Sequence, residues 1–494
     1  MISKNTLRML GLGSALSIAV LVAAPTVKAQ QDIMSPMPNE AQEAQVMVPA
    51  VPAAPVASGD NKVSTLREAV SVGVATNPEY GVVAASRRAT DEELNQGEAL
   101  FLPSLDLNGD TGYEYSDDPA TRGGLDDDDE EGMFRYEVGL TLTQMLFDGF
   151  ETKYEVERQE ARVASSAFRV RETAELVGLA IVEGYLEVLR QRQLLMIARQ
   201  NVAEHIAIMD MVEDGVGAGR STQADLEQIK ARLSQARATE TDTLQSLRNA
   251  ESRYRQEVGD APGDLTLPVI PYEQLSQDVE QEVLKSLAHS PTLDIFAADI
   301  EVAYAESLGT RSTFYPQVDL QLNARQGHDL GGIEGRDRSA SALVVMNWNL
   351  YRGGADMARA REFIHRHQQS KESRAEAARA LENDVRQTWA SMVAAGERAR
   401  QFAAQADANT EVVKAYKDQF SLDRRTLLDV LDSQNELFVS RSNTVNSEFL
   451  EMLAIYRLLA LKGDLLPTMQ VEYPRESLVS ENNTWTFEER MEAR

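Results

Sequence analysis

The chain is a tandem duplication, and this constrains its fold more than any other feature of the sequence. Four short motifs of the first half recur in the second half, at offsets of 213 residues for two of them and 204 for the others. The pairs are Asn77-Pro78 with Ser290-Pro291, Leu102-Pro103 with Tyr315-Pro316, Phe147-Asp148-Gly149 with Tyr351-Arg352-Gly353, and Thr222-x-x-Asp225 with Thr426-x-x-Asp429. Repeated offsets of this kind indicate two structural repeats, which we place at 63–262 and 275–465.

Each repeat contains two segments in which apolar and polar residues alternate, which predicts strands at about 103–116, 134–147, 316–327 and 340–351. The apolar positions are Leu105, Leu107, Tyr136, Val138, Leu140, Leu142, Val318, Leu320, Leu322, Ala342, Val344, Met346 and Trp348. Each segment reaches the roughly 9–11 residues that a membrane-spanning strand needs. Because four strands cannot close a membrane barrel, the chain must assemble, and two copies would supply eight strands whereas three would supply twelve.

Heptad patterns predict long coiled-coil helices in both repeats. We expect helices at about 78–101, 151–214, 222–258, 291–314, 354–421 and 426–463. The series in the first long helix is Ala167, Ala174, Ile181, Val188, Leu195, Val202 and Met209. At about 1.5 Å per residue, two shorter helices together match one long helix, which predicts that they stack end to end beside it. A soluble two-sheet domain on a coiled-coil stalk is the alternative.

The two ends of the chain differ from the repeats. Residues 1–29 combine a basic start, an apolar run and small residues before Ala29, which predicts a cleaved signal peptide. A membrane anchor is the alternative, but about 15 apolar residues fall short of the roughly 20 that cross a bilayer. We expect residues 30–62 to form a flexible linker, and residues 466–494 to form a polar tail that packs around the helices or hangs free.

Composition excludes several classes of function. The net charge of -29 repels phosphate backbones and argues against a nucleic-acid partner. The absence of cysteine excludes disulfides, thiolate zinc sites and cysteine nucleophiles. Because the sequence also has no phosphate loop, nucleophile elbow or zinc helix motif, we expect neither an enzyme nor a cofactor or metal site. Six consecutive acids, Asp126 to Glu131, favour a solvated loop over a cation site.

The ordered motifs resemble those of the TolC family of outer-membrane efflux and secretion channels, over nearly the whole chain after the signal peptide. The resembling segments are Asn77-Pro78-Glu79, Leu102-Pro103-Ser104-Leu105, Tyr315-Pro316-Gln317-Val318, Leu350-Tyr351-Arg352-Gly353-Gly354 and Arg425-Thr426-Leu427-Leu428-Asp429-Val430-Leu431-Asp432. The resemblance implies an α+β membrane protein in the outer membrane of a Gram-negative bacterium. In a homotrimer, a twelve-stranded transmembrane β-barrel, with four strands from each chain, would continue as a long α-helical coiled-coil tunnel in the periplasm.

The resemblance also implies a function and partners. The chain would be the exit duct of a tripartite efflux pump or type I secretion system, opened by a periplasmic adaptor and an inner-membrane ABC or proton-driven exporter. A passive porin and a non-channel periplasmic scaffold are the alternatives, and the sequence does not identify the cargo. Alternating strands placed before each long helix favour a channel, because a scaffold has no use for a lipid-facing surface.

By the same resemblance, the turn near the end of the second repeat closes the tunnel. Asp429 and Asp432 match the acids that line the periplasmic constriction, and Arg425 and Asp225 match residues that hold neighbouring helix turns together. The chain departs from the family at Phe420, where some members have tyrosine. It departs again at Asp423, which replaces a turn glycine, and at Ala224, which replaces a hydroxyl residue. These departures predict a latch that is weaker or built differently.

Helix capping is an equal explanation for part of this set. Thr222 and Asp225, like Thr426 and Asp429, have the spacing of a capping box, in which the threonine caps a helix start and the acid bonds back to it. Asp432 has no such explanation, because its counterpart in the first repeat is Gln228. It also lies on the same helix face as Asp429. For Arg425, a solvated turn residue is the alternative to a role in the gate.

Overall fold

The computed structural model describes residues 65–116 and 131–479, all of which belong to one unit of the chain, Ala57–Arg494. The predicted signal peptide (1–29) and linker (30–62) lie outside the described residues. So does the acidic run, apart from the backbone of Glu131, where a strand begins.

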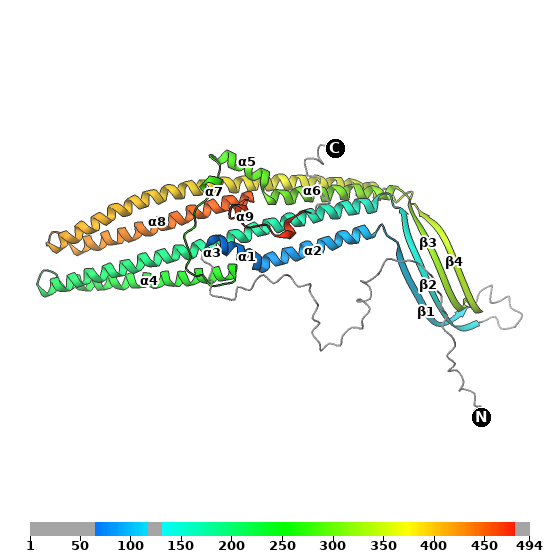
Figure 1. Cartoon of the computed structure of the whole chain (residues 1–494), viewed down its shortest axis with the longest axis horizontal. Coiled ribbons are helices and arrows are strands. Elements are labelled where there is room, and N and C mark those ends of the chain that lie inside the picture. Colours follow the sequence, from blue (N-terminus) through cyan, green and yellow to red (C-terminus); the bar gives the residue numbers. More distant parts are fainter. Residues whose placement is uncertain (1–64, 117–130, 480–494) are drawn as a thin grey trace, which may run out of the picture. The chain divides into compact units, whose positions relative to one another are not determined.

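The two halves of the described unit have the same order of elements (Figure 1). The first half contains α1 (Leu66–Thr76), α2 (Pro78–Ala99), β1 (Ser104–Ser116), β2 (Glu131–Phe147), α3 (Glu151–Gly217) and α4 (Gln223–Val258). The second contains α5 (Val279–His289), α6 (Pro291–Gly309), β3 (Gln317–Leu330), β4 (Ile333–Asn347), α7 (Ala355–Ser421) and α8 (Leu427–Lys462). Both long helices have 67 residues and both returning helices have 36, so the halves match in length as well as in order.

The structure differs from the predicted elements in two missed helices and in several element ends, most of all at β4, which begins at Ile333 and not at about 340. Helices α1 and α5, with 11 residues each, were missed because they are too short to display a heptad series. The helix expected over 291–314 ends at Gly309 and continues as a 3-10 helix, Thr310–Phe314. Strand β4 ends at Asn347 and not at 351, because Trp348 to Tyr351 already belong to the loop that leads to α7.

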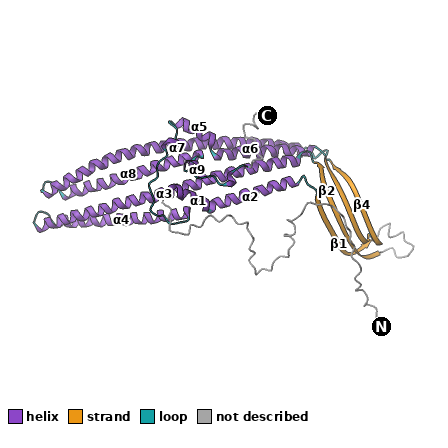
Figure 2. Cartoon of the chain, viewed as in Figure 1, coloured by secondary structure: helices purple, strands orange, loops and turns teal. Residues whose placement is uncertain are grey.

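The heptad residues of α3 form its packed surface. Ala167, Ala174, Ile181 and Val188 are fully buried. Small residues in such a seam allow close approach between helices, and α3 packs against α2 and α4 of its own half and α6 and α8 of the other. Helices α2 and α4 follow each other along α3, as α6 and α8 follow each other along α7, which is the predicted stacking of short helices beside long ones (Figure 2).

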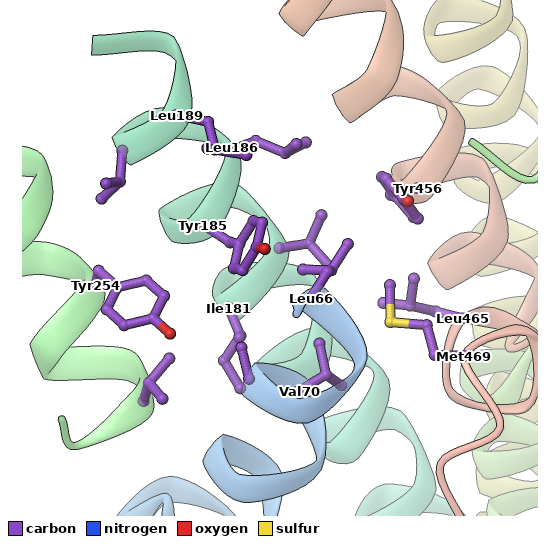
Figure 3. Packing of buried hydrophobic residues seen from close by; sticks show 14 of the residues in the cluster. Leu66, Val70, Ile181, Tyr185, Leu186, Leu189, Tyr254, Tyr456, Leu465 and Met469 are labelled. Carbon is purple, nitrogen blue, oxygen red and sulfur yellow. The ribbon is translucent and has the colours of Figure 1, made fainter. Parts of the chain in front are cut away.

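A central hydrophobic core joins the two halves (Figure 3). It draws on α1, α3, α4, α8 and the short helix α9 (Leu465–Thr468). The labelled residues are Leu66, Val70, Ile181, Tyr185, Leu186, Leu189, Tyr254, Tyr456, Leu465 and Met469. Burial of several large side chains, each contributing roughly 1.5–3 kcal/mol, fixes the helices at this level of the molecule.

The connection between the halves is held by buried polar contacts. The Tyr185 hydroxyl donates to the Thr266 carbonyl oxygen over 2.7 Å and accepts from the Thr266 backbone N–H over 3.1 Å. Lys462 lies 3.4 Å from Glu282 in an ion pair that is almost completely buried, and donates to the Gln274 carbonyl oxygen over 3.0 Å. A buried charge is stable only when it is paired in this way, so the connection is fixed and not a free linker.

The described part of the predicted tail, residues 466–479, shows the packed one of the two arrangements that the sequence left open. Leu465 and Leu466 are fully buried, because α8 ends at Gly463 in a left-handed conformation (φ 79°) that turns the chain back towards α3. The Glu175 carboxylate of α3 accepts hydrogen bonds from the backbone N–H groups of Leu465 (3.0 Å) and Leu466 (3.3 Å). The part of this segment that the structure describes therefore packs on the helices as far as residue 479.

Tyr473 holds the C-terminal segment against the Glu175 carboxyl. The Tyr473 hydroxyl oxygen lies 2.5 Å from Glu175 Oε1 and 2.6 Å from the Gly463 carbonyl oxygen. The Tyr473 hydroxyl therefore has two acceptors within reach, and its one proton is shared between the Glu175 carboxylate and the Gly463 carbonyl. Burial, opposed by these hydrogen bonds, raises the pKa of Glu175 to about 7.

We predict that this C-terminal segment loosens as pH rises. The folded pKa of Glu175 lies above its ordinary value, so its stabilising effect is present at low pH and is lost as pH rises through about 7. Hydrogen exchange at the Leu465 and Leu466 amides, corrected for intrinsic rates, should show protection falling more than about tenfold between about pH 5.5 and 8. Glu175→Gln should abolish this dependence, whereas Glu172→Gln, a neighbouring carboxyl bonded to Thr292, should keep it. Equal pH dependence in both variants would contradict the assignment.

Candidate functional site

The first candidate site is the surface of the four-stranded sheet, which is antiparallel throughout and has the order β1-β2-β3-β4. Its register aligns apolar residues in continuous rows across all four strands. One row is Leu105, Leu142, Leu322 and Ala342, and the next is Leu107, Leu140, Ala324 and Ala340. Leu107 is 72 % exposed and Val344 is 66 % exposed, so this apolar face has no cover within the described chain.

A β-bulge keeps the apolar face continuous towards the helices. The register of β2 and β3 shifts between Met145 and Phe147, so that Phe147 lies opposite Val318. The extra residue moves Phe147 onto the apolar face. There Phe147 makes edge-to-face contacts with Phe150 and Tyr315, which gather aromatic rings where the sheet meets the helices.

The opposite face of the sheet is mostly polar and is crossed by ion pairs. Arg135 contacts Asp110, Glu114 and Glu137 at 2.8–3.1 Å, and Arg325 contacts Glu137 and Asp337 at 3.3–3.4 Å. Apolar residues such as Leu343 and Val345 interrupt this face near the helices. The sheet therefore has one apolar face and one mostly polar face.

Strands β1 and β4 are the edges of this sheet, and each leaves one row of backbone N–H and C=O groups without a partner strand in the described chain. The four strands alternate in direction, so β4 of one copy would run antiparallel to β1 of a second copy. Repeated pairing of this kind can close a sheet and remove its edges.

The second candidate site is the pair of turns that end the long helices. We call residues 218–222, between α3 and α4, the first turn and residues 422–426, between α7 and α8, the second turn. A hydrophobic cluster packs the helices near the two turns together. Its buried members are Ile208, Val212, Ile229, Leu427, Val430 and Leu431. Phe420 packs against this cluster and so contributes apolar contact, not the hydroxyl of a tyrosine.

Both turns use the same helix-ending hydrogen bonds. In the first turn, Gly219 N–H donates to the Val216 carbonyl and Arg220 N–H to the Gly215 carbonyl. In the second turn, Asp423 N–H donates to the Phe420 carbonyl and Arg424 N–H to the Gln419 carbonyl. This Schellman pattern requires a left-handed residue, which glycine adopts without strain. Asp423 adopts it with φ 57°, against 74° for Gly219, so replacement of the glycine preserves the turn at a conformational cost.

Two capping boxes begin the returning helices. The Thr222 hydroxyl accepts from the Asp225 backbone N–H and the Asp225 carboxylate accepts from the Thr222 backbone N–H. Thr426 and Asp429 make the same pair of bonds. Hydrogen bonds from the side chain and backbone of Thr426 hold the pKa of Asp429 below its ordinary value. Asp225 and Asp429 therefore have a capping role, while Ala224 is an exposed residue of the first turn of α4.

Asp432 lies on α8, one turn beyond Asp429, and takes no part in the cap. Its side chain is 59 % exposed, and one carboxylate oxygen lies 3.7 Å from the Arg232 guanidinium of α4. This contact joins the two halves of the chain near the turns. At this distance and exposure it is worth little energy, so the Asp432 carboxylate remains largely available to solvent.

Arg425 is held in place by its own half of the molecule. Its guanidinium lies 4.1 Å from the centre of the Tyr416 ring and donates to Gln419 Oε1 over 3.0 Å. The same guanidinium also lies 3.9 Å from a carboxylate oxygen of Asp429. A freely solvated arginine would lack the ring contact, which contributes roughly 0.5–1 kcal/mol at exposed sites.

Sequence reasoning missed the partners of the predicted residues. Tyr416, Gln419 and Arg232 carry no motif of their own, and they reach Arg425 and Asp432 only through the packing of helices. An ion pair between Lys417 of α7 and Glu204 of α3 was missed for the same reason.

The part of the chain that the structure describes contains no group of three or more His, Cys, Asp or Glu residues that could hold a metal ion. Among the same residues, no helix is both long enough and apolar enough to cross a membrane.

Comparison with known proteins identifies what the chain resembles. The family model described as outer membrane efflux protein matches residues 73–260 and 283–452. The outer membrane efflux protein BepC of Brucella suis is 28% identical over 364 residues, covering 70% of this chain and 77% of BepC. The alkaline protease secretion protein AprF of Pseudomonas aeruginosa is 22% identical, covering 84% of this chain and 87% of AprF.

Outer membrane protein TolC of Escherichia coli K12 is 20% identical, covering 76% of this chain and 77% of TolC. Among solved structures, the outer-membrane channel OprN has a TM-score of 0.70 at 17% identity, covering 81% of this chain and 90% of OprN. At this identity the structural likeness shows the fold alone.

Proposed function

The chain belongs to the outer membrane efflux protein family, and from this we propose that three copies form a channel whose barrel crosses the outer membrane and whose helices form a tunnel in the periplasm. Family membership confirms the predicted class: a transport channel of the outer membrane of Gram-negative bacteria, the exit duct of an efflux or secretion system, and not an enzyme. The number of copies, the barrel, the partners and the gate are the parts that we propose.

The main support for a membrane barrel is that one face of the sheet is apolar and the other is ion-paired. An exposed apolar face with rows that run across all four strands is what a strand surface in contact with lipid requires, and the ion-paired opposite face suits a water-filled lumen. Strands of 13–17 residues exceed the roughly 9–11 needed to cross a bilayer.

The unpaired edges support assembly. In lipid, each unpaired backbone group costs several kcal/mol, so an open sheet of four strands is not stable there. Two copies would give eight strands, a barrel whose interior is filled by side chains, whereas three give twelve and leave space for a lumen. A conduit needs that space, which favours three copies.

We place the constriction of the tunnel at the second turn. Three copies would bring three Asp432 side chains, together with three Asp429 side chains, to one narrow opening. Asp429 is already committed to capping, so Asp432 is the residue that we assign to ion selectivity. Arg425, fixed against Tyr416, would then hold the second turn in the closed arrangement.

The names of the relatives support a proposal about the kinds of partner and cargo that the channel serves, but not about individual proteins or compounds. The name of BepC refers to efflux and that of AprF to secretion of alkaline protease, so relatives serve both kinds of system. We propose that a periplasmic adaptor and an inner-membrane exporter, of the ABC or proton-driven type, deliver cargo to this channel.

The decisive experiment combines mass and conductance. Native mass spectrometry of the purified protein in detergent should give the mass of three chains, and planar bilayers should show small, cation-selective conductance steps. A two-chain mass would contradict the trimer. Large steps that never close would support a passive porin, and a single-chain mass with no conductance would support a periplasmic scaffold.

We predict that Asp432→Asn weakens ion selectivity. Removing one carboxylate per chain at a narrow opening should reduce the cation-to-anion permeability ratio roughly twofold or more and raise the half-blocking concentration of a trivalent cation about tenfold. Reversal potentials and block curves in planar bilayers measure both. Glu227→Gln, which removes the same charge at an exposed position of α4, is the matched control and should change neither quantity. If both variants behave alike, Asp432 does not line the constriction.

We predict that Arg425→Ser opens the closed channel. The substitution removes the ring contact with Tyr416 and the hydrogen bond to Gln419, so single-channel conductance of the isolated protein should rise about twofold or more. Arg424→Ser removes the same charge from the adjacent, exposed residue and should leave conductance unchanged. An equal rise in both variants would mean that general charge, and not the Arg425 contacts, controls conductance.

A further inference from the structure

Formal charge is distributed unequally between the two faces of the sheet. The paired positions on the apolar face include no aspartate or glutamate, although the chain has 78 of these residues against 49 lysines and arginines. Apart from Asp337 on the opposite face, the nearest acid of β4 is Glu334, an exposed residue beside the register shift next to Arg336. The same paired positions include two arginines, Arg336 and Arg338, both on the edge strand β4. Exposed guanidinium groups that make no ion pair among the described residues are free to bind an external anion.

The two arginines lie directly beyond the apolar rows. The last fully apolar row ends at Ala340, the next pairs Gln326 with Arg338, and the following one pairs His328 with Arg336. Arg338 is eight residues along β4 from Met346, about 27 Å at 3.4 Å per residue. The apolar band of a membrane barrel is about 25 Å tall, and strand tilt shortens this path, so both guanidinium groups reach the interface at the far end of the band.

That interface faces the outside of the cell. The sheet ends near Arg336 with the connection between β3 and β4, whereas its other end leads into the helices. If the helices lie in the periplasm, the arginines lie at the level of the outer leaflet headgroups.

Neither arginine has an ion-pair partner among the described residues. Both side chains are exposed, unlike Arg325 on the opposite face, which contacts Glu137 and Asp337. His328, in the row of Arg336, is engaged by Asp329 at 2.7 Å and stacks on Tyr136. Arg336 and Arg338 are thus the available cations, two residues apart on one face, where adjacent side chains can converge on one group.

We propose that Arg336 and Arg338 form a binding site for a phosphate group of a phosphorylated glycolipid in the outer leaflet. The planar guanidinium donates two parallel hydrogen bonds to phosphate oxygens, and its weak hydration suits a site at the edge of an apolar surface. Tyr136, exposed on the same face and in the same row as Arg336, offers an aromatic surface at headgroup depth. This inference rests on the proposed membrane barrel.

The test measures lipid binding to the purified, full-length channel in detergent. Diphosphoryl lipid A is titrated and its retention is followed by native mass spectrometry. The double variant Arg336→Gln with Arg338→Gln should weaken binding about tenfold. Replacement of both by lysine, which keeps charge without the paired hydrogen bonds, should give an intermediate affinity. Arg325→Gln, on the opposite face of the adjacent strand, should stay within about twofold of the parent.

The outcomes separate this inference from the proposed channel. Oligomer mass and conductance are recorded for every variant, and failure of the parent in these assays overturns the channel itself. If all variants conduct but the double variant binds diphosphoryl lipid A as the parent does, the lipid site is wrong. Equal affinity for phosphatidylglycerol, or displacement by inorganic phosphate alone at millimolar concentration, would overturn the glycolipid as its occupant.

Discussion

The alanine-rich seam of α3 is the interaction on which the rest of the structure depends. Ala167, Ala174, Ile181 and Val188 are fully buried, and the helix contacts elements of both halves along its length. Small side chains at heptad positions let helix backbones approach closely, so one helix can hold several neighbours at once. Three other parts of the structure also pack on α3: the central core, the connection between the halves and the C-terminal segment. The C-terminal segment is held there by Glu175, whose carboxylate accepts a hydrogen bond from the Leu465 backbone N–H.

The sheet poses the opposite problem, because its contacts are incomplete in one chain. The sheet has an apolar face, an ion-paired face and two edges without a partner strand. Such a sheet has the features expected of one part of a closed barrel. In the barrel that we propose, hydrogen-bond satisfaction in lipid makes assembly a requirement of the fold and not a later addition. Membership of the outer membrane efflux protein family agrees with this physical argument. The lipid site that we propose at Arg336 and Arg338 would add a contact that the fold itself does not demand.

Duplication explains the turns, and divergence between the copies identifies the residues that do more than maintain them. Both turns keep the same hydrogen bonds and the same capping box, so Asp225 and Asp429 were predictable from spacing alone. Asp432 differs from its counterpart Gln228, and Asp423 keeps a left-handed turn without glycine. Because the fold tolerates either residue at these positions, their chemistry is free to serve the channel.

The sequence by itself determined the duplication, because the motifs of one half recur in the other. It also determined the alternating strands, the long helices and the capping boxes, because each of these depends on residues close together in the chain. A search for repeated heptads missed α1 and α5, because 11 residues hold a single amphipathic pattern and no repeated heptad. The sequence also could not reveal the burial of Leu465 and Leu466. Only the tertiary structure decided that Tyr416 supports Arg425, that Arg232 faces Asp432 and that Tyr473 bonds to Glu175. These contacts join residues on different turns, helices or halves, and packing alone brings such residues within reach.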